Sequence, residues 1–256
     1  MFSVEYRDRV RNRVLEHAAS DPRVVAGAIV GSLALDQGDR WSDLDLTFAV
    51  VDGVPVLSVL DDWTRSLIAE FDAIHLFDQP SGASLYRVFL FPGCLQVDLS
   101  FTPAPAFGAT SPRFKLLFGQ AVDKPHIQPP PAEDLFGDAV HLAVRARFCL
   151  ERGRPWQAEY LISWLRDDAL SLACRRRGLP ARYGRGFDDL PADVRAAFED
   201  TLVRSLEPDE LWRALGRAIA GLLREADEVP AMAAKVEPHL RELLRSLEKV
   251  SCPNQN

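Results

Sequence analysis

The chain has 256 residues, a formal net charge of −7 at pH 7 and a hydrophobic fraction of 47%, values that are ordinary for a globular protein. The negative charge disfavours a general nucleic-acid binder, and no apolar run approaches the ~18 residues of a membrane span. The scattered cysteines Cys94, Cys149, Cys174 and Cys252 match neither a zinc motif nor a disulfide framework, so we expect reduced thiols in a cytoplasmic protein.

The first part of the sequence predicts helices and strands in mixed order. Apolar residues at helical spacing predict helices over residues 3–19 and 56–70. Short apolar or alternating runs predict strands over residues 24–30, 44–50, 73–77, 84–91 and 94–101. Because Pro92 and Gly93 form a turn signal between the last two runs, we expect these two strands to form a hairpin.

The composition changes after residue 101. Two proline-rich stretches follow, at residues 101–112 and 123–134, and the second is the better linker candidate. From there on, the spacing predicts helices over residues 133–152, 155–177, 191–205, 208–227 and 230–250. The pattern therefore predicts an α+β fold, with a domain of strands and helices over residues 1–125 and an all-helical domain over residues 126–256.

Three aspartates interrupt apolar strands, where a carboxylate is costly unless it is paired or bound to a metal. Asp43 and Asp45 lie two residues apart, so their side chains should share one face of the strand. Gly31 and Ser32 follow the preceding strand, and their backbone N–H groups can approach a phosphate closely. Asp98 on a later strand completes a set of acids that suits a two-metal phosphoryl-transfer site.

The Gly-Ser turn, ten intervening residues and the Asp-Leu-Asp-Leu segment 43–46, together with Asp98, resemble the signature of DNA polymerase β-type nucleotidyltransferases. The resemblance covers about residues 20–120, and the helical half is similar in layout to aminoglycoside and lincosamide nucleotidyltransferases. It implies a mixed sheet and the transfer of a nucleoside monophosphate, expected to be AMP, from a nucleoside triphosphate such as ATP. The acceptor would be a hydroxyl of a small molecule, for example an aminoglycoside-like antibiotic.

The resemblance also implies roles for the residues of the motif. Asp43, Asp45 and Asp98 would hold two Mg²⁺ ions, and Asp98 would bind metal or take the proton of the acceptor hydroxyl. Gly31 and Ser32 would hold the triphosphate. Pyrophosphate would be the leaving group.

Two further residues are candidates for nucleotide binding, each with an alternative. Ser42 directly precedes the first aspartate, and its hydroxyl could cap the turn or contact the nucleotide, as the resemblance favours. Lys115 follows the third acid, where a cation could neutralise the phosphates and assist the departure of pyrophosphate. The alternative for Lys115 is a solvated helix face.

A polar stripe is expected on the predicted helix 155–177, where Glu159, Ser163, Arg166 and Asp167 follow at helical spacing. This stripe could line an acceptor pocket, in which acidic groups bind amines or orient a hydroxyl, or it could be a solvated face. Glu159 is also the alternative general base. The side expected to be buried comprises Leu161, Trp164, Leu165 and Leu172.

The expected partners are a nucleoside triphosphate and a small hydroxyl acceptor, without nucleic acid or membrane, in a monomer or homodimer. One alternative is an enzyme that adds AMP to a protein hydroxyl, as in toxin-neutralising relatives. Another is a nucleotide-binding protein without catalysis, which the intact set of acids disfavours.

Overall fold

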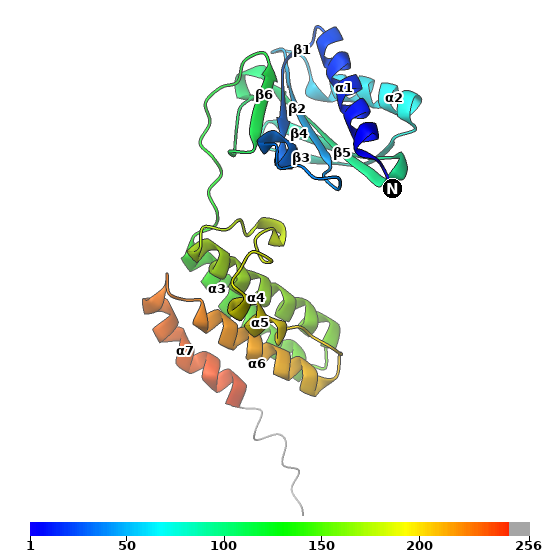
Figure 1. The fold of residues 1–256 in the computed structure, drawn as a ribbon. Helices are drawn as coiled ribbons and strands as arrows, with labels where there is room; N and C mark the ends of the chain where they lie inside the picture. Colours follow the sequence, from blue (N-terminus) through cyan, green and yellow to red (C-terminus); the bar gives the residue numbers. More distant parts are fainter. Residues whose placement is uncertain (246–256) are drawn as a thin grey trace, which may run out of the picture. The chain divides into compact units, whose positions relative to one another are not determined.

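The computed structural model describes residues 1–245, which fall into two compact units, Met1–Ile127 and a second unit that begins at Gln128. The first unit contains a sheet with helices, and the second consists of helices and loops (Figure 1). This confirms the predicted α+β fold with a mixed sheet followed by a helical region. Cys252 and the end of the predicted helix 230–250 lie outside the described residues.

The described residues of the first unit form a six-stranded sheet with the strand order β3-β4-β5-β2-β1-β6. The central strands β2 and β5 run parallel, and the other neighbouring strands run antiparallel. The parallel pair places the starts of β2 and β5 at the same edge of the sheet. The strands are β1 Val24–Val30, β2 Leu44–Val50, β3 Ile74–Ser81, β4 Ser84–Phe91, β5 Leu95–Pro103 and β6 Phe114–Phe118.

Strands β3 and β6 depart most from the prediction, and β5 ends at Pro103 instead of residue 101. The edge strand β3 continues to Ser81 instead of ending at residue 77, because its polar second half pairs with β4 in a hairpin. The strand β6 was not predicted, since its five residues follow a proline-rich stretch and show no alternation of apolar and polar residues. It pairs with β1 at the other edge of the sheet.

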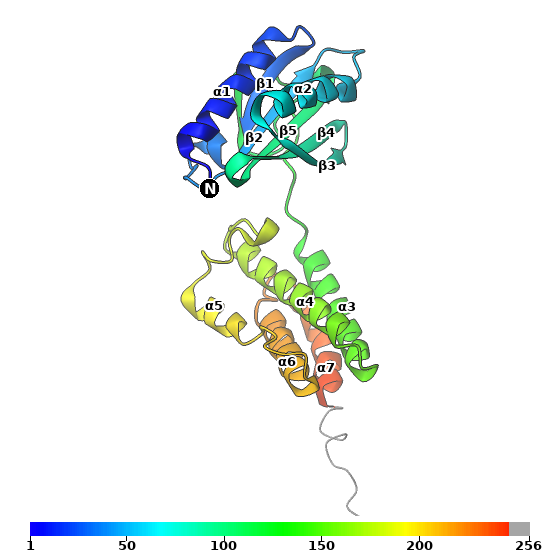
Figure 2. The same ribbon diagram turned by 90° about the vertical axis from the view of Figure 1, so that its right-hand side faces the viewer.

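Helices α1 (Val4–Ser20) and α2 (Val56–Phe71) cover one face of the sheet (Figure 2). Alternate residues of β2 and β5 enter the core under these helices, among them the fully buried Leu46 and Leu99. Since successive side chains of a strand point to opposite faces, the residues between them point away from α1 and α2. That opposite face carries the aspartates of the two strands.

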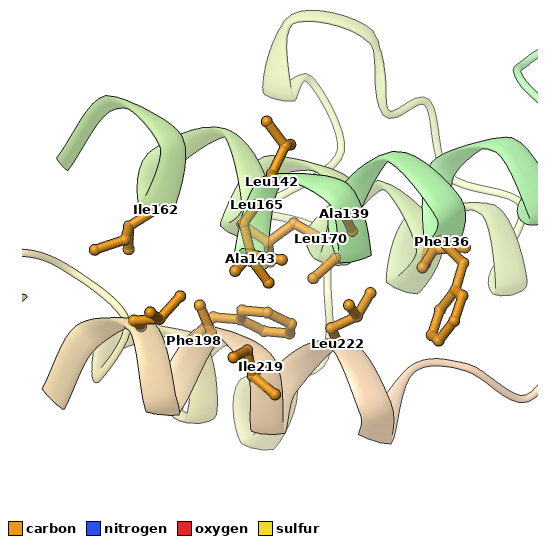
Figure 3. Close-up of a cluster of buried hydrophobic side chains, with 14 of the residues drawn as sticks. Phe136, Ala139, Leu142, Ala143, Ile162, Leu165, Leu170, Phe198, Ile219 and Leu222 are labelled. Carbon is orange, nitrogen blue, oxygen red and sulfur yellow. The ribbon is translucent and has the colours of Figure 1, made fainter. Parts of the chain in front are cut away.

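The second unit contains the helices α3 (Ala132–Glu151), α4 (Pro155–Arg176), α5 (Ala192–Glu199), α6 (Pro208–Arg224) and α7 (Pro230–Arg245). Proline is the first residue of α4, α6 and α7. The backbone N–H at this position has no acceptor within the helix, so proline, which lacks an N–H, costs the helix no hydrogen bond there. Side chains from α3, α4, α5 and α6 meet in one apolar core, which is shown in Figure 3 by residues that include Ala139, Leu165, Phe198 and Leu222.

The structure corrects three predictions in this unit, the smallest being that α6 ends at Arg224 instead of residue 227. Helix α5 ends at Glu199 instead of residue 205, because Arg213 of α6 donates hydrogen bonds to the backbone carbonyls of Asp200 and Leu202. These carbonyls therefore receive their hydrogen bonds from a side chain and not from a further helical turn. Trp164, which we expected on the buried side of α4, is 44% exposed.

Candidate active site

Asp45 and Asp98 occupy directly paired positions on the parallel strands β2 and β5. Their neighbours in sequence belong to the core under α1 and α2, so both carboxylates point to the opposite face of the sheet. The next pair on that face is Thr47 and Ser100, and the Ser100 hydroxyl lies 2.8 Å from the Thr47 hydroxyl in a hydrogen bond. The two aspartates are thus the first members of a polar ladder that crosses the centre of the sheet.

The backbone of Gly31 packs directly against the carboxylate of Asp45. Gly31 follows β1, opens the short 3-10 helix Gly31–Leu35, and has a φ of +75°. A Cβ atom at this position would lie 2.2 Å from Oδ2 of Asp45. Glycine is therefore required both by the left-handed backbone and by the space that the carboxylate occupies. Ser32 is half-buried in the same turn, and its carbonyl accepts the N–H of Gln37.

The pKa of Asp98 is raised, first by burial and further by the negative charge of Asp43. A hydrogen bond of 3.1 Å from Nε2 of Gln96 to Oδ1 of Asp98 acts in the opposite direction. Asp43 therefore lies close enough to Asp98 for the two carboxylates to repel each other. Together with the pairing of Asp45 and Asp98, this places the predicted aspartates in one region of the sheet.

The aspartates fit a divalent cation in their chemistry. Carboxylate oxygens are the ligands that Mg²⁺ prefers. Burial is the main cause of the raised pKa of Asp98, and a cation would relieve the repulsion from Asp43 that adds to it. Among residues 1–245, no group of three or more His, Cys, Asp and Glu side chains is arranged so that it could hold a metal ion. Metal binding by Asp43, Asp45 and Asp98 therefore stays a prediction.

Ser42 closes the turn in front of Asp43. Its Oγ accepts the N–H of Asp39 at 2.9 Å and donates to Oδ1 of the same aspartate at 3.1 Å. The N–H of Trp41 donates to that oxygen as well, at 2.8 Å. Of the two alternatives for Ser42, the structure supports the turn cap.

Lys115 lies on the edge strand β6 and not on a helix, and its side chain is 50% exposed, so the solvated part of the alternative holds. Its partner in the neighbouring strand is Ile29, which belongs to the core under α1 and α2. By strand alternation Lys115 leaves the sheet on that face, whereas Asp45 leaves it on the other. Its ammonium group lies 3.2 Å from Oδ1 of Asp36, at the end of the Gly31–Leu35 turn.

The remaining predicted residues lie on α4 in the second unit. Glu159 accepts a hydrogen bond of 2.7 Å from the Ser163 hydroxyl, and Arg166 lies 3.5 Å from the carboxylate of Asp167. Partial burial raises the pKa of Asp167, whose side chain is still 56% exposed, and the charge of Arg166 lowers this pKa. The buried side of α4 includes Leu161, Leu165 and Leu172, as predicted.

The sequence did not single out Asp168, although it is the most perturbed acid of the second unit. Its side chain is buried, and Oδ2 finds no hydrogen-bond partner among the residues that the structure describes. Burial, followed by the charges of Asp138 and Asp167, raises the pKa of Asp168 to about 7. At four-residue intervals before it, α4 carries the exposed aromatic residues Trp156, Tyr160 and Trp164.

No protein-family model and no curated protein matches the chain. Among solved structures, the chain is similar to an aminoglycoside 6-adenyltransferase from Bacillus subtilis, with 15% identity, coverage of 91% of this chain and 96% of that chain, and a TM-score of 0.42. It is also similar to a nucleotidyltransferase-like protein from Exiguobacterium sibiricum, with 15% identity, coverage of 87% and 76%, and a TM-score of 0.38. Each TM-score is below 0.5, so the functional proposal rests on the residues of the site.

Proposed function

We propose that the protein catalyses the Mg²⁺-dependent transfer of a nucleoside monophosphate, AMP in the first instance, from a nucleoside triphosphate to a hydroxyl of a small molecule. The observation that supports this most strongly is the pairing of Asp45 with Asp98 on parallel strands, with the Gly31 backbone packed against Asp45. Two carboxylates beside a glycine, whose backbone a phosphate can approach closely, suit a triphosphate and its cations.

In this proposal, Asp43 and Asp45 bind the cations, while the turn at Gly31 and Ser32 holds the triphosphate. Bound Mg²⁺ would offset the negative charge on the triphosphate and on the leaving pyrophosphate. Asp45 is held by strand pairing and by Gly31, so its oxygens have a defined place before any ligand binds.

Asp98 is the proposed general base. The acceptor oxygen attacks the α-phosphorus, the bond from that phosphorus to the oxygen bridging to the β-phosphate breaks, and pyrophosphate leaves. The acceptor proton passes to the carboxylate of Asp98, whose Oδ1 already accepts a hydrogen bond from Gln96. Since its pKa is raised, ionised Asp98 is a stronger base than an ordinary aspartate.

For the acceptor, the second unit favours a molecule with an amino group, as in aminoglycoside-like antibiotics. Asp168 is a buried carboxylate with an oxygen that lacks a partner among residues 1–245, and Asp138 and Asp167 add negative charge around it. An ammonium group bound there would favour the ionised form of Asp168 and compensate the negative charge of the three carboxylates. The exposed aromatic residues on α4 can contact organic cations through their ring faces.

The proposal is tested by incubating the protein with Mg²⁺, each common nucleoside triphosphate and a panel of aminoglycosides, lincosamides and simpler polyols. Mass spectrometry should find an acceptor that has gained one nucleoside monophosphate, with an equal amount of pyrophosphate. Asp45→Asn should abolish the product, whereas Asp52→Asn, at an exposed aspartate that follows β2, should retain it. Full activity of Asp45→Asn would contradict the proposal, and a nucleotide adduct on proteins alone would favour the protein-modifying alternative.

A further inference from the structure

Helix α1 buries one charged side chain on its core face. Its buried positions follow helical spacing and are Arg7, Val10, Val14 and Ala18. Arg7 is only 5% exposed. An apolar residue is typical of such a position, because burying a guanidinium removes its hydration. A specific use of this charge would explain why it is there.

The guanidinium of Arg7 holds the turn that leads into the aspartate motif. Its Nη1 donates to the backbone carbonyl of Asp39 at 2.6 Å and to that of Ser42 at 3.0 Å. These two residues are the first and last of the turn that the Ser42 hydroxyl closes. The Ser42 carbonyl belongs to the peptide group that joins Ser42 to Asp43, so the contact fixes the chain directly before the first aspartate.

The hydrogen bonds of Arg7 are incomplete. Its Nε is buried and finds no acceptor among residues 1–245. A buried donor without a partner destabilises a fold, so an apolar side chain would serve the packing of α1 better. The side chain is therefore better explained by its hold on the turn than by its packing in the core.

Different contacts hold Asp43 and Asp45 in place. Asp45 lies inside β2 and is held by strand pairing and by the contact with Gly31. Asp43 precedes the first residue of β2, so the ladder of the sheet does not fix its backbone. Its position depends on the turn in front of it, and that turn is anchored by Arg7.

We propose that Arg7 is a positioning residue, which holds the turn before Asp43 and so orients this carboxylate for the cation binding and nucleotidyl transfer proposed above. The inference rests on the proposed function for its catalytic part. Its structural part concerns the order of the turn and the affinity for a divalent cation, and both can be measured without turnover.

The test compares Arg7→Met and Arg7→Lys with Val10→Ala in the full chain. Lysine keeps the charge, but its ammonium group lies one bond nearer the backbone than Nη1, the atom that makes both contacts. Val10→Ala loosens the same helix face and removes no hydrogen bond to the turn. In both Arg7 variants we expect amide hydrogen exchange of residues 39–43 to be about 10- to 100-fold faster, because bonds to a charged donor are lost. The Kd for Mn²⁺ should rise and kcat should fall by about 10- to 100-fold, the usual effect of removing a residue that orients a ligand. At a divalent-cation concentration that saturates the variant, the KM for the nucleotide should change by less than about threefold, since the triphosphate turn is intact.

Val10→Ala should lower the melting temperature and leave exchange of the turn, Mn²⁺ affinity and kcat unchanged. Wild-type Mn²⁺ affinity in Arg7→Lys, or in a folded Arg7→Met, would overturn the inference and leave Arg7 as an anchor of α1. If the wild-type protein transfers no nucleotide, the proposed function fails. Amide hydrogen exchange of the turn and Mn²⁺ affinity still show whether Arg7 positions Asp43. Absence of Mn²⁺ binding by the wild-type protein would overturn both.

Discussion

The buried carboxylate of Asp168 should make the stability of the protein depend on pH. Burial and the neighbouring acids Asp138 and Asp167 raise its pKa from an ordinary value of 3.8 to about 7. In the unfolded chain the group ionises near its ordinary value, so between these two pH values the folded state binds more protons than the unfolded state. Stability therefore falls as the pH rises through this range, and the loss is complete above pH 7.

The size of the effect follows from the displacement of the pKa. A rise from 3.8 to about 7 corresponds to a loss of about 4 kcal/mol in the free energy of unfolding at pH 8. Asp168→Asn removes the ionisation but leaves a polar side chain of the same shape at the site. The difference in unfolding free energy between Asp168→Asn and the wild type should therefore grow by about 4 kcal/mol from pH 4 to pH 8, in favour of the variant.

Urea unfolding followed by far-UV circular dichroism at several pH values from 4 to 9 measures this difference. If the two units unfold in separate transitions, each transition is fitted by itself. Asp188→Asn replaces an exposed aspartate of the same unit and is the matched control. A constant difference for Asp168→Asn would refute the reasoning that its carboxylate is held neutral by its surroundings.

Three further outcomes are expected. Gly31→Ala should abolish transfer and should destabilise the protein more than Gly53→Ala does. Both positions have positive φ, but only a Cβ at Gly31 meets the Asp45 carboxylate, and an equal fall of the melting temperature in the two variants would contradict this. Asp98→Asn should keep the affinity for Mg-nucleotide within about threefold in calorimetry but lower the rate of transfer by about 10²- to 10⁴-fold, whereas Glu159→Gln should stay active. The reverse result would make Glu159 on α4 the general base. Removing divalent cations with EDTA should abolish both transfer and the thermal stabilisation by nucleotide, and an undiminished stabilisation would show that the nucleotide binds without a cation.

Local patterns explain why much of the fold was predictable. The strands β1 and β2 begin and end at the predicted residues, since each is an apolar run bounded by turn residues. The hairpin of β4 and β5 follows from its Pro-Gly turn. The aspartates stood out because Asp43 and Asp45 alternate with leucines at the start of an apolar run, a pattern that predicts a shared face. The direct pairing of β2 with β5 is a long-range contact, and the sequence did not specify its register.

The residues that the sequence missed depend on such contacts. Arg7 lies in a helix with many charged residues, and only the packing of α1 on the sheet shows that it is buried. Asp168 follows Asp167 directly, and the rotation of α4 in its bundle buries one and leaves the other exposed. The same rotation exposes Trp164, which was expected in the core. The periodicity of the sequence shows which residues share a helix face, but it does not show how the helix is rotated against the neighbours that cover that face.

The central claim is that the α-phosphate of a nucleoside triphosphate moves to an acceptor at the site of Asp45 and Asp98. Parallel reactions with nucleotide labelled at the α-phosphate or at the γ-phosphate test it most directly, with an acceptor taken from the panel. The account predicts that the α label appears in the acceptor, that the γ label appears in pyrophosphate, and that both transfers disappear in Asp45→Asn. A γ label in the acceptor, or an α label that still reaches the acceptor in Asp45→Asn, would contradict it.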